Sequence, residues 1–380
     1  MSSPIEELRE LGQSLWLDNI RRQLITSGEL ARLREEGISG VTSNPTIFEK
    51  AVSGSTDYNE ALVREVAAGH DAEHILWELM LEDIRAAADV FRPVYDTTGG
   101  ADGYVSIEVS PRLAMDTEGT VAMARDLFQR ADRPNVMVKI PGTKSGLPAI
   151  RRMLGEGVNI NVTLIFSTER YDEVVDAFMS GLEDLKSSGG DPSKVGSVAS
   201  FFVSRVDTKI DKLLDAKIGA ATSPADKERL ARLLGKAGIA NSKVAYEHWK
   251  QLHSGPRWET LRAAGARPQR CLWASTSTKD PRYPDTMYVE SLIGPGTIDT
   301  LPEKTLEAFI DHGRVRNALE AELDLAQRQL AELQAVNISL DRVTMELEAE
   351  GVEAFAQSYQ QLLATTQASA AAAAAGEEQQ

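Results

Sequence analysis

Lys139 lies in the run Asn135-Val-Met-Val-Lys-Ile-Pro-Gly-Thr143, where a single lysine stands among apolar, strand-type residues just before a Pro-Gly turn. A buried cation is costly, and desolvation favours the neutral amine, which can attack a carbonyl carbon and form a Schiff base. The position therefore predicts a nucleophile. The alternative is a lysine whose stem follows the strand while its ammonium reaches solvent at the strand end.

Polar residues also stand at or near the ends of other strand-type runs, namely Asp18, Asn44, Glu108, Asn161, Thr163, Ser200, Arg205, Ser275 and Lys279. Taken singly, Asp18 can cap a helix and Asn44, before Pro45, can be a turn residue. Glu108 can neutralise Lys139 as a structural pair. Together they supply a nucleophile, carboxylates, amides, hydroxyls and cations, a set that suits carbonyl chemistry on a phosphorylated polyol.

The elements that must position these residues alternate between short strand-type runs and longer amphipathic segments, which indicates a parallel sheet with helical crossovers. We expect eight strands, at 15–18, 40–44, 104–109, 136–140, 158–166, 195–203, 270–275 and 286–291. Eight strands favour a closed (β/α)8 barrel of the TIM type. In such a barrel the chemistry lies at the C-terminal ends of the strands, where the polar residues fall.

Helical segments are expected outside the barrel as well. About sixty residues separate the second and third runs, and this gap holds at least two helices. Beyond Leu301 the chain is helical, with segments at 318–333 and 341–363. We expect residues 1–365 to form one barrel domain with helical insertions and C-terminal helices, and residues 366–380 to form an Ala-rich, disordered tail.

Composition limits the classes of partner. The 380 residues are 42% hydrophobic and 26% charged, as in ordinary globular proteins, and the net charge of −16 opposes binding to nucleic acid or anionic membranes. We find no apolar run long enough to span a membrane and no signal-peptide pattern at the N-terminus, so we expect a cytoplasmic protein. The single cysteine, Cys271, lies in an apolar run and is interpreted as a buried, inert thiol.

Two further motifs are weaker. His70-Asp-Ala-Glu-His74 matches the pattern of inverted zinc proteases, but it opens an amphipathic helix and is better interpreted as a solvated first turn. The turn Gly142-Thr-Lys-Ser-Gly146 fits neither a P-loop nor a dinucleotide fingerprint, although Lys144 could contact an anion.

Three segments resemble the signatures of the transaldolase family: Gly40-Val-Thr-Ser-Asn-Pro-Thr-Ile-Phe48, Val138-Lys-Ile-Pro-Gly-Thr143 and Asn159-Ile-Asn-Val-Thr-Leu-Ile-Phe-Ser167. Their order and spacing match, the resemblance runs from about Leu15 to Pro302, and the length is similar to that of the longer bacterial subgroup. It implies a class I aldolase-type barrel that moves a dihydroxyacetone unit from sedoheptulose 7-phosphate or fructose 6-phosphate to glyceraldehyde 3-phosphate or erythrose 4-phosphate. The pathway implied is the non-oxidative pentose phosphate pathway.

The resemblance also implies roles. Lys139 matches the Schiff-base lysine, Asp18 the acid/base residue at the donor C4 hydroxyl, and Glu108 with Thr163 the pair that holds a proton-shuttling water. The positions that bind substrate are Asn44, Asn161 and Ser200 for the hydroxyls and Arg205 for the phosphate. We expect no metal or organic cofactor, because the lysine supplies the electron sink, and we expect a monomer or homodimer.

One departure concerns the phosphate. Shorter members carry a second phosphate-binding arginine two residues after the serine of an Ala-Ser pair, where this chain has Ser277 after Ala274-Ser275. Lys279 is the candidate substitute, with Ser275 beside it. Two alternative functions remain, a class I aldolase and a non-catalytic sugar-phosphate sensor. Related aldolases tend to carry a tyrosine where this chain has Phe202, which favours transfer.

Overall fold

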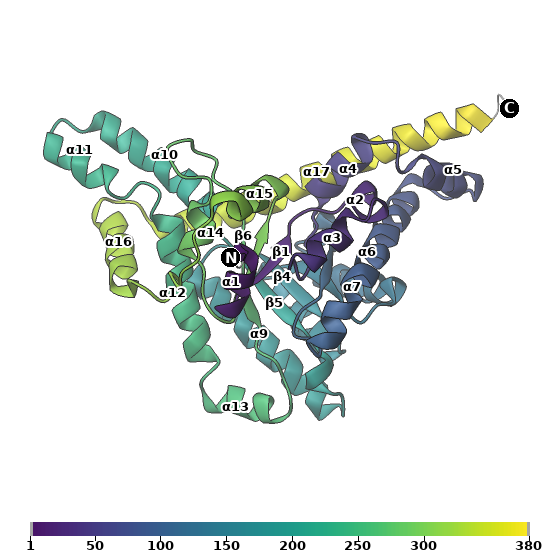
Figure 1. The fold of residues 1–380 in the computed structure, drawn as a ribbon, viewed down its shortest axis with the longest axis horizontal. Helices are drawn as coiled ribbons and strands as arrows, with labels where there is room; N and C mark the ends of the chain where they lie inside the picture. Colours follow the sequence, from purple (N-terminus) through teal and green to yellow (C-terminus); the bar gives the residue numbers. More distant parts are fainter. Residues whose placement is uncertain (1–2, 378–380) are drawn as a thin grey trace.

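The computed structural model describes residues 3–377, and its centre is one parallel sheet that curls into a barrel (Figure 1). The seven strands are β1 (Ser14–Leu17), β2 (Val105–Glu108), β3 (Val136–Pro141), β4 (Ile160–Ile165), β5 (Ser197–Phe202), β6 (Arg270–Ala274) and β7 (Ile298–Leu301). Their order in the sheet is β1-β7-β6-β5-β4-β3-β2, and every pairing is parallel.

The barrel closes at Val41. This residue forms parallel bridges to Leu17 of β1 and to Val105 of β2, the two edge strands of the sheet. The expected second strand at 40–44 is therefore present only as this bridge. Gly40 is required beside it, because a Cβ atom there would lie 2.6 Å from the Trp16 ring. The predicted TIM-type barrel class is confirmed, with seven strands and this bridge where eight strands were expected.

The helices that surround the sheet are α1 (Pro4–Glu10), α2 (Arg22–Thr26), α3 (Glu29–Glu35), α4 (Pro45–Ser53), α5 (Asn59–Ala67), α6 (Ala72–Thr97), α7 (Thr117–Ala131), α8 (Gly146–Gly155), α9 (Thr168–Ser187), α10 (Ser204–Ala220), α11 (Pro224–Ala231), α12 (Ala237–Leu252), α13 (Pro256–Ala263), α14 (Met287–Ser291), α15 (Glu303–His312), α16 (Leu323–Ala335) and α17 (Leu340–Glu377). As expected, α4, α5 and α6 fill the gap between the second and third strand positions. Short 3-10 turns lie at Pro111–Leu113 and Pro192–Lys194.

The inside of the barrel has an apolar layer below a polar one. Side chains two apart on a strand share a face, so Met137 and Lys139 point the same way on β3, as do Val198 and Ser200 on β5. The lower positions belong to an apolar cluster that contains Trp16, Tyr104, Met137, Val198, Leu272 and Ile298. The upper positions carry the polar residues, which is why residues far apart in the sequence converge.

One predicted strand is wrong. Residues 286–291 form α14, and the last strand is β7 (Ile298–Leu301). The hydroxyl of Thr286 donates to Glu290 Oε1 at 2.8 Å, a contact across one helical turn that an extended run would separate. The true strand has four buried residues, including Asp299, so it shows neither an apolar run nor a polar alternation.

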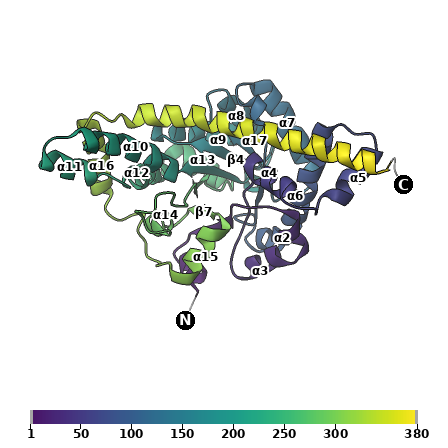
Figure 2. The ribbon, with the colours of Figure 1, turned by 90° about the horizontal axis from the view of Figure 1, so that it is seen from above.

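Helix α17 crosses the C-terminal ends of the strands and runs along the whole molecule, from α10 to α5 (Figure 2). It packs on α4, α5, α6 and α10. The Ala-rich stretch that we expected to be disordered continues this helix as far as Glu377, since alanine has the highest helix propensity, and residues 378–380 lie outside the described part. The buried Thr366 lies within it.

No helix of the described residues is long and apolar enough to cross a membrane. The expected environment of Cys271 is confirmed. Its thiol is buried and lies 3.4 Å from the Tyr171 hydroxyl, and burial raises the pKa of the thiol to about 12, so it stays protonated and unreactive.

Candidate active site

A cavity of about 1100 Å³ opens at the C-terminal ends of the strands. Of the residues predicted from the sequence, it is lined by Asp18, Asn44, Lys139, Ser200, Arg205, Ser275 and Lys279. The other three, Glu108, Asn161 and Thr163, are buried on β2 and β4, the strands that flank β3. The structure therefore gathers the predicted residues at one end of the barrel.

Lys139 stands at the floor of this cavity and is 5% exposed. Its Nζ lies 3.6 Å from Glu108 Oε2 and donates to the Ser43 carbonyl oxygen at 3.2 Å. Burial raises the pKa of Glu108 to about 7, although the positive charge of Lys139 opposes the shift. A carboxyl group poised near neutrality beside an amine can exchange a proton with it or with a water between them. The alternative of a solvent-reaching lysine is excluded by the burial.

Asp18 directly follows β1 and also lines the cavity. Burial raises the pKa of its carboxyl group, while the charge of Lys139 and a hydrogen bond from Thr42 oppose this. The Thr42 hydroxyl donates to Asp18 Oδ1 at 2.7 Å and lies 2.6 Å from the Thr300 hydroxyl. Asp18 caps no helix, because the next helix begins after Arg21. Its carboxyl group is free to serve as an acid or base.

Asn161 and Ser200 form a fixed polar pair on neighbouring strands. The Ser200 hydroxyl donates to Asn161 Oδ1 at 2.7 Å, and Asn161 Nδ2 donates to the Ser106 hydroxyl at 3.1 Å. All three side chains are buried. These hydrogen bonds fix the orientation of the Asn161 amide. Ser200 is the member of this group that lines the cavity.

Glu108 and Thr163 carry buried polar atoms without a hydrogen-bond partner among the described residues, although Glu108 forms the ion pair with Lys139. Both carboxylate oxygens of Glu108 and the hydroxyl of Thr163 are buried and make no hydrogen bond with any described residue. Buried polar groups are normally satisfied, so such atoms mark a place for water or a substrate oxygen. Glu108 is in register with Lys139 on β2, and Thr163 lies on β4 two residues beyond Asn161, the register partner of Lys139.

Arg205, at the start of α10, is held without an acidic partner. Its guanidinium lies 5.0 Å from the Phe202 ring and 5.9 Å from the Phe355 ring of α17, and it makes no ion pair or hydrogen bond with a described residue. Burial lowers the pKa of Arg205 but leaves it charged. Its donors remain available to an anion.

The loop after β6 carries two more of the predicted residues, Ser275 and Lys279, to the cavity. Ser275 adopts a left-handed conformation (φ 58°), and its hydroxyl lies 2.9 Å from that of Ser204. Lys279 Nζ donates to the Ser277 hydroxyl at 2.8 Å, and both residues line the cavity. Asn44 does cap α4, through its Oδ1, yet it also lines the cavity.

Several residues of the cavity escaped the sequence interpretation. Thr42 lines the cavity, and the carbonyl oxygen of Ser43 accepts from Lys139. Both stand inside the quoted motif beside Asn44, so a closer inspection of that strand end would have found them. Lys50, Lys209 and Lys212 add positive charge along α4 and α10, and Leu347, Glu350, Gly351, Ala354 and Phe355 come from α17. Nothing in the sequence pattern of α17, which begins at Leu340, links it to the barrel whose last strand ends at Leu301.

A buried lysine near the end of a barrel strand, with the Glu108 carboxyl group beside it and further cations at the cavity wall, places the protein among (β/α)8 barrels whose site suits carbonyl chemistry. The model of the transaldolase/fructose-6-phosphate aldolase family matches residues 15–366, and the chain belongs to this family. The match extends past Pro302, where the motif-based resemblance ended, and includes most of α17.

The relatives are similar over nearly the whole chain. The transaldolase of Parafrankia sp. (strain EAN1pec) is 51% identical over 367 residues, which cover 96% of this chain and 97% of the relative. The transaldolase of Thermobifida fusca is 48% identical, with coverage of 96% and 97%. The transaldolase of Trichodesmium erythraeum is 44% identical, with coverage of 94% and 95%. The expected transaldolase function is confirmed at the level of the family and of these relatives.

Proposed function

We propose that this protein transfers a dihydroxyacetone unit from a ketose phosphate, sedoheptulose 7-phosphate or fructose 6-phosphate, to an aldose phosphate through an iminium on Lys139. The observation that carries the proposal is the buried Lys139 beside Glu108, at 3.6 Å, on the floor of a cavity lined by cations. The aldose phosphate acceptors are glyceraldehyde 3-phosphate and erythrose 4-phosphate, and the pathway is the non-oxidative pentose phosphate pathway.

The first half of the reaction builds the iminium. The Lys139 amine attacks the donor ketone and gives a carbinolamine. Glu108, through a water that it holds with Thr163, delivers the proton with which the carbinolamine hydroxyl leaves as water. The pKa of Glu108 near 7 suits this role, because an acid near the working pH can both give and regain the proton.

The second half breaks and remakes a carbon–carbon bond. Asp18 takes the proton of the donor C4 hydroxyl, the C3–C4 bond breaks, and its electron pair moves into the iminium to leave an enamine. The aldose phosphate departs. The enamine carbon then attacks the aldehyde of the acceptor, which restores an iminium on Lys139, and Asp18 returns the proton to the new hydroxyl. Water then adds to this iminium, Glu108 takes back the proton that it gave, and the product ketose phosphate leaves the Lys139 amine. Asn44, Asn161 and Ser200 bind the donor hydroxyls.

The phosphate lies against Arg205 in this proposal, with Ser275 and Lys279 on the facing loop. Arg205 supports the assignment because no carboxylate neutralises it and its donors are free. Lys279 takes the place of the second arginine of shorter members. It is a point charge without the bidentate geometry of arginine, so Arg205 contributes most of the binding.

A second candidate is a class I aldolase that releases dihydroxyacetone to water, since the family description includes fructose-6-phosphate aldolase. Phe202, which lines the cavity and stacks on Arg205, disfavours it. A phenyl ring cannot hold the water that hydrolyses the three-carbon intermediate. The intermediate then survives until an acceptor arrives.

Three wider expectations are part of the proposal. The protein works in the cytoplasm. It is a monomer or homodimer, and the exposed large apolar residues described (Val63, Met115, Leu213, Ile310, Leu325 and Met345) lie on separate elements. Residues 1–365 form one barrel domain with its added helices, although the buried Thr366 argues that the boundary with the tail lies a few residues later.

The experiment that tests the function is turnover of fructose 6-phosphate, followed as glyceraldehyde 3-phosphate release, with and without erythrose 4-phosphate. We expect release that requires the acceptor and disappears in Lys139→Ala. Equal release without acceptor would make the protein an aldolase. Unchanged release by Lys139→Ala would remove this lysine from the mechanism.

A further inference from the structure

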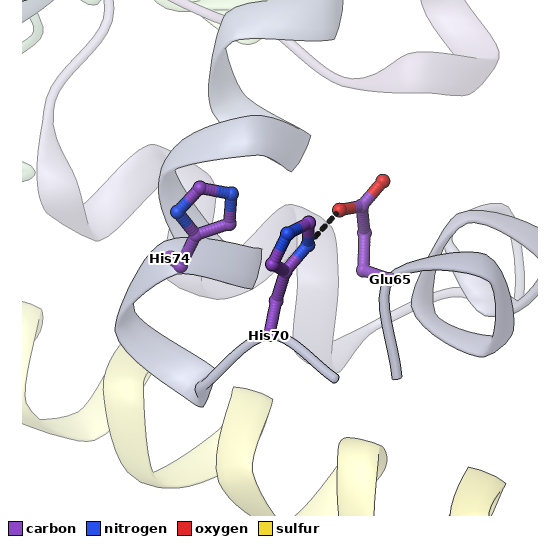
Figure 3. A group of neighbouring side chains, drawn as sticks. All are labelled: Glu65, His70 and His74. Carbon is purple, nitrogen blue, oxygen red and sulfur yellow. Dashed lines mark hydrogen bonds and ion pairs between the residues drawn. The ribbon is translucent and has the colours of Figure 1, made fainter. Parts of the chain in front are cut away.

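A group of potential metal ligands lies far from the cavity residues in the sequence, where α5 ends and α6 begins. Figure 3 shows Glu65 of α5 and His70 of the connecting turn facing each other, with His74 of the first turn of α6 beside them. One ligand atom from each residue can be chosen so that all three lie within 4.8 Å of one another. Two imidazoles and a carboxylate are a ligand set that borderline divalent cations prefer.

The geometry is close to what such an ion requires. His70 Nδ1 lies 2.8 Å from Glu65 Oε2, and the centroids of the two imidazole rings are 4.0 Å apart. An ion about 2.0–2.2 Å from each ligand atom needs separations of roughly 3 to 3.5 Å between them. Both imidazoles are partly exposed, so small rotations about their side-chain bonds reach these separations.

The surrounding groups leave the three ligands available. Glu65 is largely buried, and its second oxygen, Oε1, accepts from Arg64 Nε at 3.1 Å, which orients the carboxylate. His74 lies 3.9 Å from Glu78, a separation that imposes little restraint. Metal-bound carboxylates are commonly held by such an outer hydrogen bond.

The H-x-x-E-H pattern contains both histidines of this group but not Glu65. In the zinc-protease pattern the glutamate before the second histidine, Glu73, would be the general base. Here Glu73 instead accepts a hydrogen bond from the Tyr359 hydroxyl of α17 at 2.7 Å. The third potential ligand is Glu65, which stands five residues before His70 and therefore outside the H-x-x-E-H pattern.

We propose that Glu65, His70 and His74 bind one divalent transition-metal ion of the Zn²⁺ or Co²⁺ type, with water in the remaining positions, and that the ion fastens the end of α5 to the start of α6. The role is structural. The ion lies beside Glu73, so it stabilises the corner on which α17 rests through Tyr359. The site is separate from the transfer chemistry and does not depend on it.

The test is calorimetric titration of the untagged, full-length chain with Zn²⁺ at neutral pH. We expect one equivalent to bind, and the melting temperature to rise with Zn²⁺ because an ion that binds only the folded state stabilises it. His74→Ala and Glu65→Gln should each lose this binding step and the rise in melting temperature. His248→Ala is the matched control, since His248 is a half-exposed histidine paired only with Asp172, and it should bind Zn²⁺ as the wild type does.

A spectroscopic arm separates this site from general surface binding. Co²⁺ held by two imidazoles and a carboxylate in a site of low coordination number absorbs visible light more strongly, and at longer wavelength, than the pink hexaaqua ion. We expect this stronger absorption in the wild type and in His248→Ala but not in His74→Ala. The proposal is overturned if the wild type binds no Zn²⁺. It is equally overturned if His74→Ala and Glu65→Gln bind Zn²⁺ as the wild type does.

Discussion

Glu108 and Lys139 share a buried environment in which each group depends on the other. Burial disfavours the charged carboxylate and the lysine favours it, and the balance sets the pKa of Glu108 at about 7. In the proposed mechanism Glu108 supplies the proton for dehydration of the carbinolamine. Glu108 carries this proton below about pH 7 and loses it above that pH.

The first prediction concerns the rate of iminium formation from fructose 6-phosphate. In the wild type this rate should fall as pH rises from about 6 to about 9, with an apparent pKa near 7, and in Glu108→Gln it should be lower by ~100-fold or more and independent of pH in this range. Rapid quenching with borohydride measures the rate. A Glu108→Gln variant that keeps the wild-type pH dependence would assign the titration to another group.

Asp299 allows a prediction about stability away from the site. It is buried on β7 without a cation, and burial raises its pKa to about 8, although the Thr276 hydroxyl donates to it at 2.8 Å. A carboxyl group whose pKa is raised on folding destabilises the fold as pH rises from the unfolded pKa near 4 to the folded one.

Asp299→Asn removes this titration and keeps the shape of the side chain. Relative to the wild type, the variant should gain stability with rising pH, at ~1.4 kcal/mol per unit between about pH 4 and about pH 8, and no more above. Denaturant unfolding at several pH values measures the difference. A constant difference over this range would show that Asp299 is ionised in the folded protein.

The sequence predicts single residues well where a polar type interrupts an apolar strand. Lys139, Glu108 and Asn161 stand out in this way, and all three are buried beside one another. Thr42 and Ser106 do not, because threonine and serine are common in strands. Their importance comes from contacts across the barrel, to Asp18 and Asn161, that a sequence does not display.

At the scale of elements, α17 completes the wall of the cavity. Phe355 lies over Arg205, and Gly351 lets the helix approach closely, since a Cβ there would lie 2.9 Å from Leu164 Cδ2. Ion pairs from Lys209 to Glu346 (2.8 Å) and Glu350 (2.5 Å) hold the helix to α10. In the proposed mechanism Phe355 is therefore a positioning residue for Arg205, the proposed phosphate-binding group.

Phe355→Leu tests this role. A cation–π contact is worth roughly 0.5–2 kcal/mol, so the KM for fructose 6-phosphate should rise roughly 2- to 30-fold with little change in kcat. Trapping of unphosphorylated dihydroxyacetone on the enzyme should not change. Met345→Ala, an exposed substitution on the same helix, is the control. Equal losses with phosphorylated and unphosphorylated compounds would indicate a general disturbance instead.

Elements were predictable in proportion to the strength of their local pattern. Long amphipathic helices such as α6 and α10 were found, as were the strands built from apolar residues. The run at 286–291 was mistaken for a strand, because Met, Tyr and Val favour strands and a side-chain contact between Thr286 and Glu290 decides otherwise. The position of α17 over the cavity rests on tertiary contacts alone.

At the scale of the whole molecule, charge is distributed unevenly. The chain carries −16 overall, yet its cavity is lined by Lys50, Lys139, Arg205, Lys209, Lys212 and Lys279. A cationic cavity in an anionic protein attracts phosphates to one place and repels them elsewhere. Such attraction weakens as salt shortens the Debye length from ~30 Å at about 0.01 M to ~10 Å at about 0.1 M.

We therefore predict that the KM for fructose 6-phosphate rises several-fold over this range of ionic strength. Lys212→Gln removes one lysine of the cavity and leaves Lys139 in place. This variant should have a higher KM than the wild type at low salt, and its KM should depend less on salt. Steady-state kinetics with an uncharged viscosity control measures both effects. A KM that does not respond to salt would show that the lysines outside the phosphate site contribute nothing to binding.

The measurement that tests the central claim most directly is borohydride reduction of the enzyme in the presence of fructose 6-phosphate, followed by peptide mass analysis. The account predicts a reduced three-carbon adduct on the peptide that contains Lys139 and on no other, and no adduct in Lys139→Ala. An adduct on Lys279 or Lys209, or continued transfer by an enzyme that forms none, would contradict the account.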